Sequence, residues 1–168
     1  TAYYDNDKNY PKELKKQVES ALRKTEKEMG AVFGDKDNPL LLSVRSGARA
    51  SMPGMMETVL NVGLNDVTRE GLIKKTKNPR FVYDSQRRLI QMYSDVVMEK
   101  AAGIEPKDGQ GVRVQLEHEL KKMKDKYGYT SDTQLTLENL EELIGIYKNK
   151  VLEVIGKPFP EDPMEQLW

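Results

Sequence analysis

Cysteine is absent from this 168-residue chain. Without thiols there can be no disulfide framework and no thiolate metal site, and an intracellular, cytoplasmic location is the default expectation. Long apolar runs are also missing, because the longest is only a few residues against the roughly 20 that a membrane-spanning helix needs. We therefore expect no membrane partner.

An excess of charge of either sign is lacking as well. The chain has Lys+Arg 27 and Asp+Glu 27, which gives a formal net charge of +0. A protein that binds nucleic acid through the phosphate backbone usually presents a basic field. We therefore expect no nucleic-acid partner, and any anion site has to be local.

Helical periodicity covers most of the sequence. Apolar residues recur every three or four positions over 11–29, where Pro11 suits the first turn and Gly30 the end. Later stripes predict further helices over 66–75, over 79–101, around Leu116–Tyr127, and over 137–155 with Thr136 as N-cap. Three long stripes joined by breaks indicate a small helical bundle.

The pattern changes after the turn-like segment Gly34–Pro39. Leu40–Ser46 begins with a short apolar run and is typical of a buried strand. A second strand is expected over Glu57–Leu64, where Thr58, Leu60 and Val62 alternate with Val59, Asn61 and Gly63. The predicted fold class is α+β, predominantly helical, with a small strand component.

Two arginines stand in the segment between these strands, and no acidic residue lies between Asp37 and Glu57. Arg45 ends the first strand, and Arg49 follows in a run of small residues. Glycines allow a close approach of the backbone, and the arginine fork matches phosphate oxygens, so phosphate is the natural ligand. The alternative is a surface loop whose arginines pair with distant carboxylates, and residue spacing alone leaves both open.

The methionines of Met52–Met56 also have two interpretations. Methionine more often fills gaps in a core than contacts a ligand, although such polarizable side chains can line a base pocket beside a phosphate loop. His118 lies in EHEL on a charged helix, and we expect it to be a solvated helix residue without a catalytic role. At the other end, Asp162 and Pro163 form a helix start signal, and the chain stops soon after. A short helix is marginal alone, so we expect a piece of a longer polypeptide.

The segment VRSGARASMPGMMETVLNVGLND, residues 44–66, resembles the ATP-binding segment of the pyruvate, phosphate dikinase family. The resemblance extends through FGDKDNPLL before it and NPRFVYDSQRRLIQMYSDVV after it, and it reaches DPMEQL near the end. Practically the whole chain is covered. A stretch this long and this unusual in composition is far more specific than a lone glycine-rich loop.

The resemblance implies an enzyme that converts pyruvate, ATP and phosphate to phosphoenolpyruvate, AMP and pyrophosphate through a phospho-histidine. Arg45, the catalytic candidate, would contact the phosphates of ATP, with Thr58 as a polar contact. Met55 and Met56 would lie near the base, and Arg49 would contact the nucleotide or brace the loop. The implied nucleotide-binding residues are thus Arg45, Arg49, Gly54, Met55, Met56 and Thr58.

The resemblance also implies what lies outside the chain. The lysine of a glycine-rich segment, the acidic Mg²⁺ ligands and the phospho-histidine belong to other parts of such an enzyme, so the expected partners are ATP and the remaining domains of a homo-oligomeric enzyme. Residues 1–64 would form part of an ATP-grasp-like nucleotide-binding subdomain, 65–150 a helical insertion, and 151–168 a return segment. The expected strands would belong to an incomplete sheet and tend to associate through their edges.

A second function from a different class is kept beside this one. The chain could be a non-catalytic helical interaction module whose arginine loop binds acidic groups of a partner. The first function requires a glycine-rich lysine segment and acidic metal ligands elsewhere in the same polypeptide, whereas the second requires neither.

Overall fold

The structure is a computed structural model, and it describes residues 2–7, 9–45 and 58–168, apart from the side chains of Ala2 and Tyr4. The chain is α+β and predominantly helical, as predicted. Its α-helices are α1 (Ala2–Asp5), α2 (Leu14–Met29), α3 (Asp66–Thr76), α4 (Pro79–Tyr93), α5 (Val112–Tyr127), α6 (Leu137–Ile155) and α7 (Pro163–Leu167). A π-helix, η1 (Ser94–Lys100), continues α4, and a 3-10 turn, η2, covers Asp132–Gln134.

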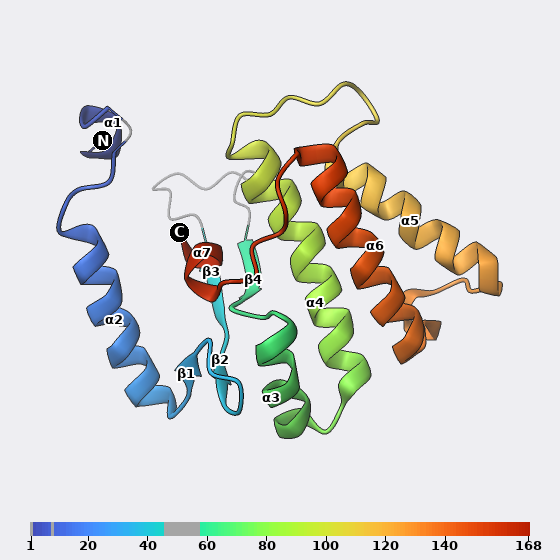
Figure 1. The fold of residues 1–168 in the computed structure, drawn as a ribbon, viewed down its shortest axis with the longest axis horizontal. Helices are drawn as coiled ribbons and strands as arrows, with labels where there is room; N and C mark the ends of the chain where they lie inside the picture. The colour runs from blue at the N-terminus through green and yellow to red at the C-terminus, as the bar shows by residue number, and fades with distance from the viewer. Residues whose placement is uncertain (1, 8, 46–57) are drawn as a thin grey trace.

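Four short strands complete the described part of the chain. They are β1 (Val32–Phe33), β2 (Pro39–Leu40), β3 (Leu42–Arg45) and β4 (Thr58–Val62). In Figure 1 the strands lie between α2 on one side and the group of α4, α6 and α5 on the other. Among the described residues, no helix is both long and apolar enough to cross a membrane.

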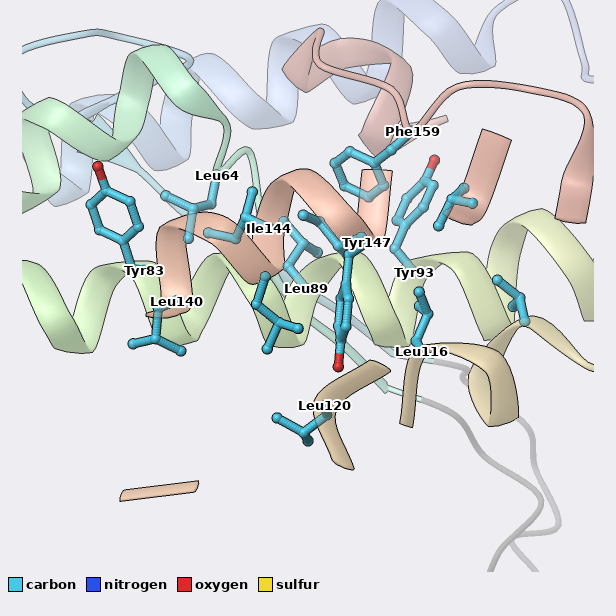
Figure 2. Packing of buried hydrophobic residues seen from close by; sticks show 14 of the residues in the cluster. Leu64, Tyr83, Leu89, Tyr93, Leu116, Leu120, Leu140, Ile144, Tyr147 and Phe159 are labelled. Atoms are coloured by element: carbon cyan, nitrogen blue, oxygen red, sulfur yellow. The ribbon is translucent and has the colours of Figure 1, made fainter. Parts of the chain in front are cut away.

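The helices α4, α5 and α6 form the bundle that the sequence predicts. α6 packs against both α4 and α5, and the three run side by side in Figure 1. The fully buried side chains at their contacts include Leu89, Ile90, Leu116, Leu140 and Tyr147, several of which Figure 2 shows packed together. Val59, Val62 and Leu64 belong to the same buried cluster, so one core joins the bundle to β4.

Two helix predictions need correction at their ends. α2 begins at Leu14, with Glu13 as its N-cap, so Pro11 lies before the helix and not in its first turn. Gly30 ends α2 with φ 60, as predicted, because glycine adopts the left-handed conformation without steric cost. The helix expected over 79–101 does continue to Lys100, but its last part is a π-helix, in which the N–H of Ala101 bonds the carbonyl of Val96. The spacing of apolar residues in the sequence did not predict this π-helical turn.

A single buried strand over Leu40–Ser46 is wrong. The segment divides into β2, which pairs in parallel with β1, and β3, which pairs antiparallel with β4. Leu40 is buried, whereas Ser43, Val44 and Arg45 are exposed. The segment divides because its two halves form hydrogen bonds with different partner strands, and its hydrophobicity does not show where the division lies. The strand β1 was not predicted from the sequence.

Simple alternation along the second strand is also wrong. Val59 and Val62 are both buried although they are three residues apart. Two steps along β3, from Val44 to Leu42, face three steps along β4, from Val59 to Val62. The extra residue makes a β-bulge, and Asn61 within it has φ 61. The bulge returns Val62 to the face that Val59 already occupies.

Local capping signals in the sequence are confirmed. The Thr136 hydroxyl accepts from the N–H of Asn139, whose side chain bonds back to the N–H of Thr136, a capping box at the start of α6. Asp162 accepts from the N–H groups of Met164 and Glu165 at the start of α7. These contacts span only three residues, which is why sequence reasoning finds them.

Candidate nucleotide site

Arg45 and Thr58 are paired directly across the antiparallel strands β3 and β4. Side chains at directly opposed positions point to the same face of a sheet, with Cβ atoms about 5 Å apart. The neighbouring pair, Val44 and Val59, points to the other face, where Val59 enters the core beside α4. Arg45 and Thr58 therefore share the face of the strand pair that points away from the buried cluster.

The guanidinium of Arg45 is available to a ligand. Arg45 is exposed, and among the residues that the structure describes it forms no ion pair. A free, permanently charged fork with several N–H donors can bind phosphate oxygens in a bidentate manner. The half-buried Thr58 hydroxyl can donate or accept one hydrogen bond beside it.

The other nominated residues lie between these two strand ends. Arg49, Gly54, Met55 and Met56 belong to residues 46–57, which are outside the described residues. Arg45 and Thr58 thus mark the two ends of that segment. Of the six nominated residues, the structure brings these two together, and the roles of the other four stay predictions.

A cavity of about 340 Å³ lies beside β4 and the bundle. Its apolar lining comes from Leu60, Met92 and Val96, and its polar lining from Asn61, Arg88, Gln91, Asp95 and Arg113. The cations here are engaged: Arg88 donates to Asp84 over 2.9 Å, and Arg113 donates to Glu117 over 3.0 Å. The Glu117 carboxylate, with Asp95 close by, raises the pKa of Arg113 above its ordinary value despite partial burial.

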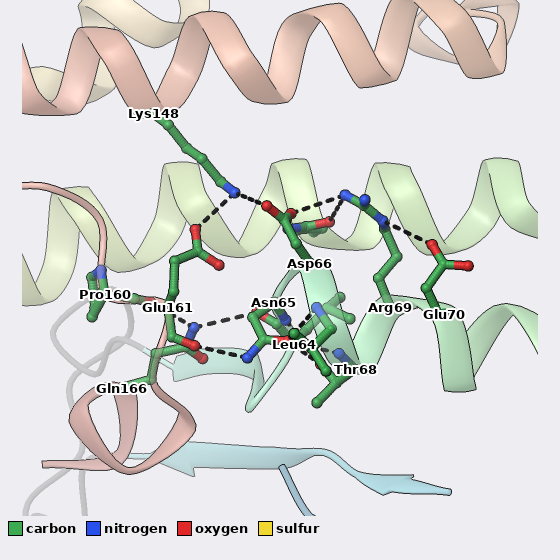
Figure 3. Close-up of polar contacts among 12 residues, drawn as sticks. Leu64, Asn65, Asp66, Thr68, Arg69, Glu70, Lys148, Pro160, Glu161 and Gln166 are labelled. Carbon is green, nitrogen blue, oxygen red and sulfur yellow. Dashed lines mark hydrogen bonds and ion pairs between the residues drawn. The ribbon is translucent and has the colours of Figure 1, made fainter. Parts of the chain in front are cut away.

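A buried polar network fixes the end of β4 to α3 and α7 (Figure 3). The Asn65 side chain accepts from the N–H groups of Val67 and Thr68, which caps α3, and donates to the carbonyl of Glu161 over 2.7 Å. Gln166, only 3% exposed, accepts from the N–H of Gly63 over 2.8 Å. The bonds of Asn65 with Glu161 and of Gln166 with Gly63 join residues about 100 positions apart. They hold the end of the strand that carries Thr58.

Asp66 extends this network to α4 and α6. Its carboxylate accepts from Lys148 over 2.8 Å and from Gln86 over 2.8 Å, and Lys148 also reaches Glu161 over 2.7 Å (Figure 3). Partial burial favours a higher pKa for Asp66, but the bonds from Lys148 and Gln86 outweigh it and hold the pKa below its ordinary value. The bonds of the folded structure therefore favour the charged form of the Asp66 carboxylate.

The described residues offer no metal centre. No group of three or more His, Asp or Glu side chains among them could hold a metal ion. His118 is exposed on α5, as the sequence suggests.

Comparison with known proteins gives this geometry a context. Residues 6–101, more than half of the chain, match the family described as "Pyruvate phosphate dikinase, AMP/ATP-binding domain". The chain belongs to this family. The matched range contains Arg45, Thr58 and Asn61, so the strand pair β3–β4 is part of a domain of the AMP/ATP-binding type.

Similarity to full-length proteins of the family extends over nearly all of the chain. The chain is 49% identical to pyruvate, phosphate dikinase of Clostridium symbiosum over 99% of the chain's own length. It is 45% identical to the protein of the same name from Rhizobium meliloti (strain 1021), also over 99% of the chain. Pyruvate, phosphate dikinase 1, chloroplastic, of Zea mays is 44% identical over 98% of the chain. The chain spans only 18%, 17% and 16% of these relatives, respectively.

Sequence reasoning missed two residues that shape this site. Asn61 forms the bulge, and Gln166 anchors β4 from the far end of the chain. A signal for the bulge was present, because a glycine inside a strand pattern, here Gly63, often marks a bulge, and a nearby asparagine tolerates the left-handed conformation. No local signal indicates Gln166, whose partners Gly63 and Leu64 lie about 100 residues earlier.

Proposed function

We propose that this chain forms one wall of the ATP site in a full-length pyruvate, phosphate dikinase. That enzyme would convert pyruvate, ATP and phosphate to phosphoenolpyruvate, AMP and pyrophosphate through a phospho-histidine in another domain. Family membership and the names of the relatives support the proposal. Because the chain spans less than a fifth of those relatives, we expect it to be inactive alone.

The single observation that carries the proposal is the position of Arg45 opposite Thr58 on the open face of β3–β4. Arg45 would neutralise charge on the phosphates of ATP, which is the main task of a protein in phosphoryl transfer. Thr58 would supply a polar contact to the same nucleotide. Gly54, Met55 and Met56 would lie along the nucleotide, with the methionines near the base, and Arg49 would contact it or brace the loop.

Magnesium would enter with ATP. It would neutralise charge on the triphosphate. The family resemblance supports placing the acidic Mg²⁺ ligands in other parts of the full-length enzyme. The task left to this chain is to orient the phosphates through Arg45 and to fix Thr58 beside them.

The finer architecture is part of the proposal. Residues 1–64 would belong to an ATP-grasp-like nucleotide-binding subdomain, 65–150 would be a helical insertion and 151–168 would return to that subdomain. The single core shared by β4 and the bundle supports a rigid attachment of the insertion. We further propose a cytoplasmic, homo-oligomeric enzyme whose other domains complete the site.

The alternative, a non-catalytic helical interaction module, is not favoured. It predicts no relation to an AMP/ATP-binding domain, whereas the family match covers the strand pair and its loop. A partner-binding arginine loop would also not require Thr58 opposite Arg45.

Replacing Arg45 in the full-length enzyme tests the proposal. Arg45→Ala should slow the ATP-dependent half-reaction on the order of 10²-fold, as for other preorganised donors, while exchange between pyruvate and phosphoenolpyruvate stays nearly unchanged. Arg45→Lys should restore part of the loss, because a point charge cannot reproduce the fork. Arg23→Ala, at an exposed arginine of α2, is the control and should leave both half-reactions intact. An unchanged ATP half-reaction in Arg45→Ala would refute the role of Arg45, and equal damage to both half-reactions would indicate misfolding instead.

A further inference from the structure

The bulge in β4 decides which side chains share a face with Arg45. Val62 is 1% exposed and is held in the core. In a regular strand, side chains alternate strictly between the two faces, so Val62 would place Leu60 and Thr58 on its own buried face. The observed pairing differs, because three steps from Val59 to Val62 oppose two steps along β3.

Straightening the bulge, with every residue of β4 kept, would change the partner of Arg45. With Leu42 still opposite Val62, a regular register pairs Val44 with Leu60 and Arg45 with Val59. Thr58 would then point toward the core side, away from the face of Arg45. A slip of one residue turns every side chain of a strand over, so the contact pair of the proposed site exists only if the bulge is kept.

Asn61 is the residue in the bulge with the unusual backbone, at φ 61. Asparagine tolerates this left-handed conformation better than most residues, whereas a β-branched side chain strongly resists it. The carbonyl of Asn61 also accepts from the N–H of Leu64 over 3.1 Å, which starts the turn toward α3. Its side chain is half-buried and lines the cavity beside α4.

We infer that Asn61 is a positioning residue for the nucleotide site. Its left-handed backbone maintains the bulge that places Thr58 beside Arg45 on the open face of β3–β4. Asn61 acts through the register of the strands and not by touching the nucleotide. The inference rests on the proposed function, since it concerns the geometry of the same two residues.

Three substitutions in the full-length enzyme separate backbone conformation from the loss of a side chain. Asn61→Gly and Asn61→Asp can both keep a positive φ, whereas Asn61→Val cannot do so without strain. We expect Asn61→Val to lower kcat/KM for ATP about tenfold or more, because the strained backbone would favour the regular register, in which Thr58 leaves the face of Arg45. Asn61→Gly should remain within about threefold of the unsubstituted enzyme, and exchange between pyruvate and phosphoenolpyruvate should stay unchanged in all three.

Lys77 provides a matched control. It is also a non-glycine residue with positive φ, at 53, but it ends α3 away from the strand pair. Lys77→Val should introduce similar backbone strain and leave kcat/KM for ATP unchanged. An equal loss in Lys77→Val and Asn61→Val, or an equal loss in Asn61→Gly and Asn61→Val, would overturn the positioning role.

A cross-linking measurement reads the register directly. The pair Arg45→Cys with Thr58→Cys should form a disulfide readily, since directly opposed residues meet the distance requirement. The pair Arg45→Cys with Val59→Cys should form one poorly, because the two side chains point to opposite faces. Adding Asn61→Val to each double-cysteine protein should lower the disulfide yield of the first pair and raise that of the second. Mass spectrometry of the linked peptides would measure both yields. The same preference with and without Asn61→Val would overturn the inference.

The two proposals fail in distinguishable ways. If Arg45→Ala leaves the ATP half-reaction untouched, the nucleotide role of this face is wrong. If Arg45→Ala slows the ATP half-reaction but Asn61→Val changes neither kcat/KM for ATP nor the cross-linking preference, only the positioning role of Asn61 is wrong.

Discussion

The side-chain oxygen of Gln166 accepts a 2.8 Å hydrogen bond from the backbone N–H of Gly63. The amide nitrogen of Gln166 also donates to the carbonyls of Leu64 and Pro160, over 3.3 and 2.9 Å. One buried side chain therefore bonds three backbone groups from two segments that are far apart in the sequence. Through these bonds α7 holds the end of β4, the strand that carries Thr58.

Gln166→Glu should destabilise the fold by about 2 kcal/mol or more. A carboxylate keeps the acceptor for Gly63 but loses both donors, and it buries a charge beside two carbonyls. Denaturant unfolding would measure the loss. Glu165→Gln, an exposed neighbour on α7, should shift stability by less than about 0.5 kcal/mol, and comparable effects of the two changes would contradict this account.

Gly71→Ala should also be costly, although alanine is the better helix former. A Cβ at Gly71 would clash with the carbonyl oxygen of Lys36 and lie 2.8 Å from Pro39, so α3 would have to move away from the turn before β2. We expect a loss of about 1–3 kcal/mol, as for other overpacked sites. Gly145→Ala on α6, where a Cβ meets nothing within 4 Å, should be neutral or stabilising. Thermal unfolding of both variants checks the contrast.

Tyr147 should couple stability to alkaline pH. Burial raises the pKa of its hydroxyl to about 12, although the nearby Arg87 acts to lower it. The folded pKa lies above the ordinary value of about 10. The contribution of protonated Tyr147 to the free energy of unfolding is therefore fully present below about pH 10 and is lost as the pH rises toward about 12. Tyr147→Phe removes this titration, so its unfolding free energy should fall less between pH 10 and 12, as urea melts would show. The same slope in both proteins would contradict the prediction.

Truncating the same side chain tests packing rather than titration. The Tyr147 ring is fully buried, whereas its hydroxyl has no hydrogen-bond partner among the described residues. Tyr147→Phe should therefore be close to neutral at pH 7, and Tyr147→Ala should cost about 3–5 kcal/mol. A large loss for Tyr147→Phe at neutral pH would reveal a bond from Arg87 that stabilises the fold.

Edge pairing through β3 should make the isolated chain associate. β3 pairs with β4 on one side, and among the described residues no strand pairs with its other edge. Exposed edges recruit further strands, and a lysine on the edge discourages this. We expect concentration-dependent sedimentation that Val44→Lys reduces. A monomer at high concentration, with amide exchange protection across both strands, would contradict the expectation.

The isolated chain should bind ATP weakly. A nucleotide cleft normally buries most of its ligand between several elements, and this chain offers Arg45 and Thr58 on an open face. Calorimetry with ATP and Mg²⁺ at physiological salt should give a dissociation constant weaker than about 10 μM, near −7 kcal/mol. Tighter binding would mean that the site is more self-contained than proposed.

Most of the helices, several of their caps and the family follow from the sequence alone. Helical period and capping depend on residues three or four apart, so Thr136, Asp162 and Gly30 act where local reasoning places them. Arg45 could be nominated from residue chemistry and from the resemblance of 44–66, whereas Thr58 was nominated from the resemblance alone. Four of the six nominated site residues lie in 46–57, and their placement stays a prediction.

The pairing of the strands depends on contacts between distant parts of the chain. Whether Leu40 and Leu42 belong to one strand depends on β1 and β4, which bond them from separate sheets. Register depends on which side chains the bundle buries, and Val59 and Val62 both enter that core because Asn61 adopts a left-handed backbone between them. A strand has no internal hydrogen bonds, so its pairing partner and its facing direction come from residues far along the chain, as the bond from Gly63 to Gln166 shows at the end of β4.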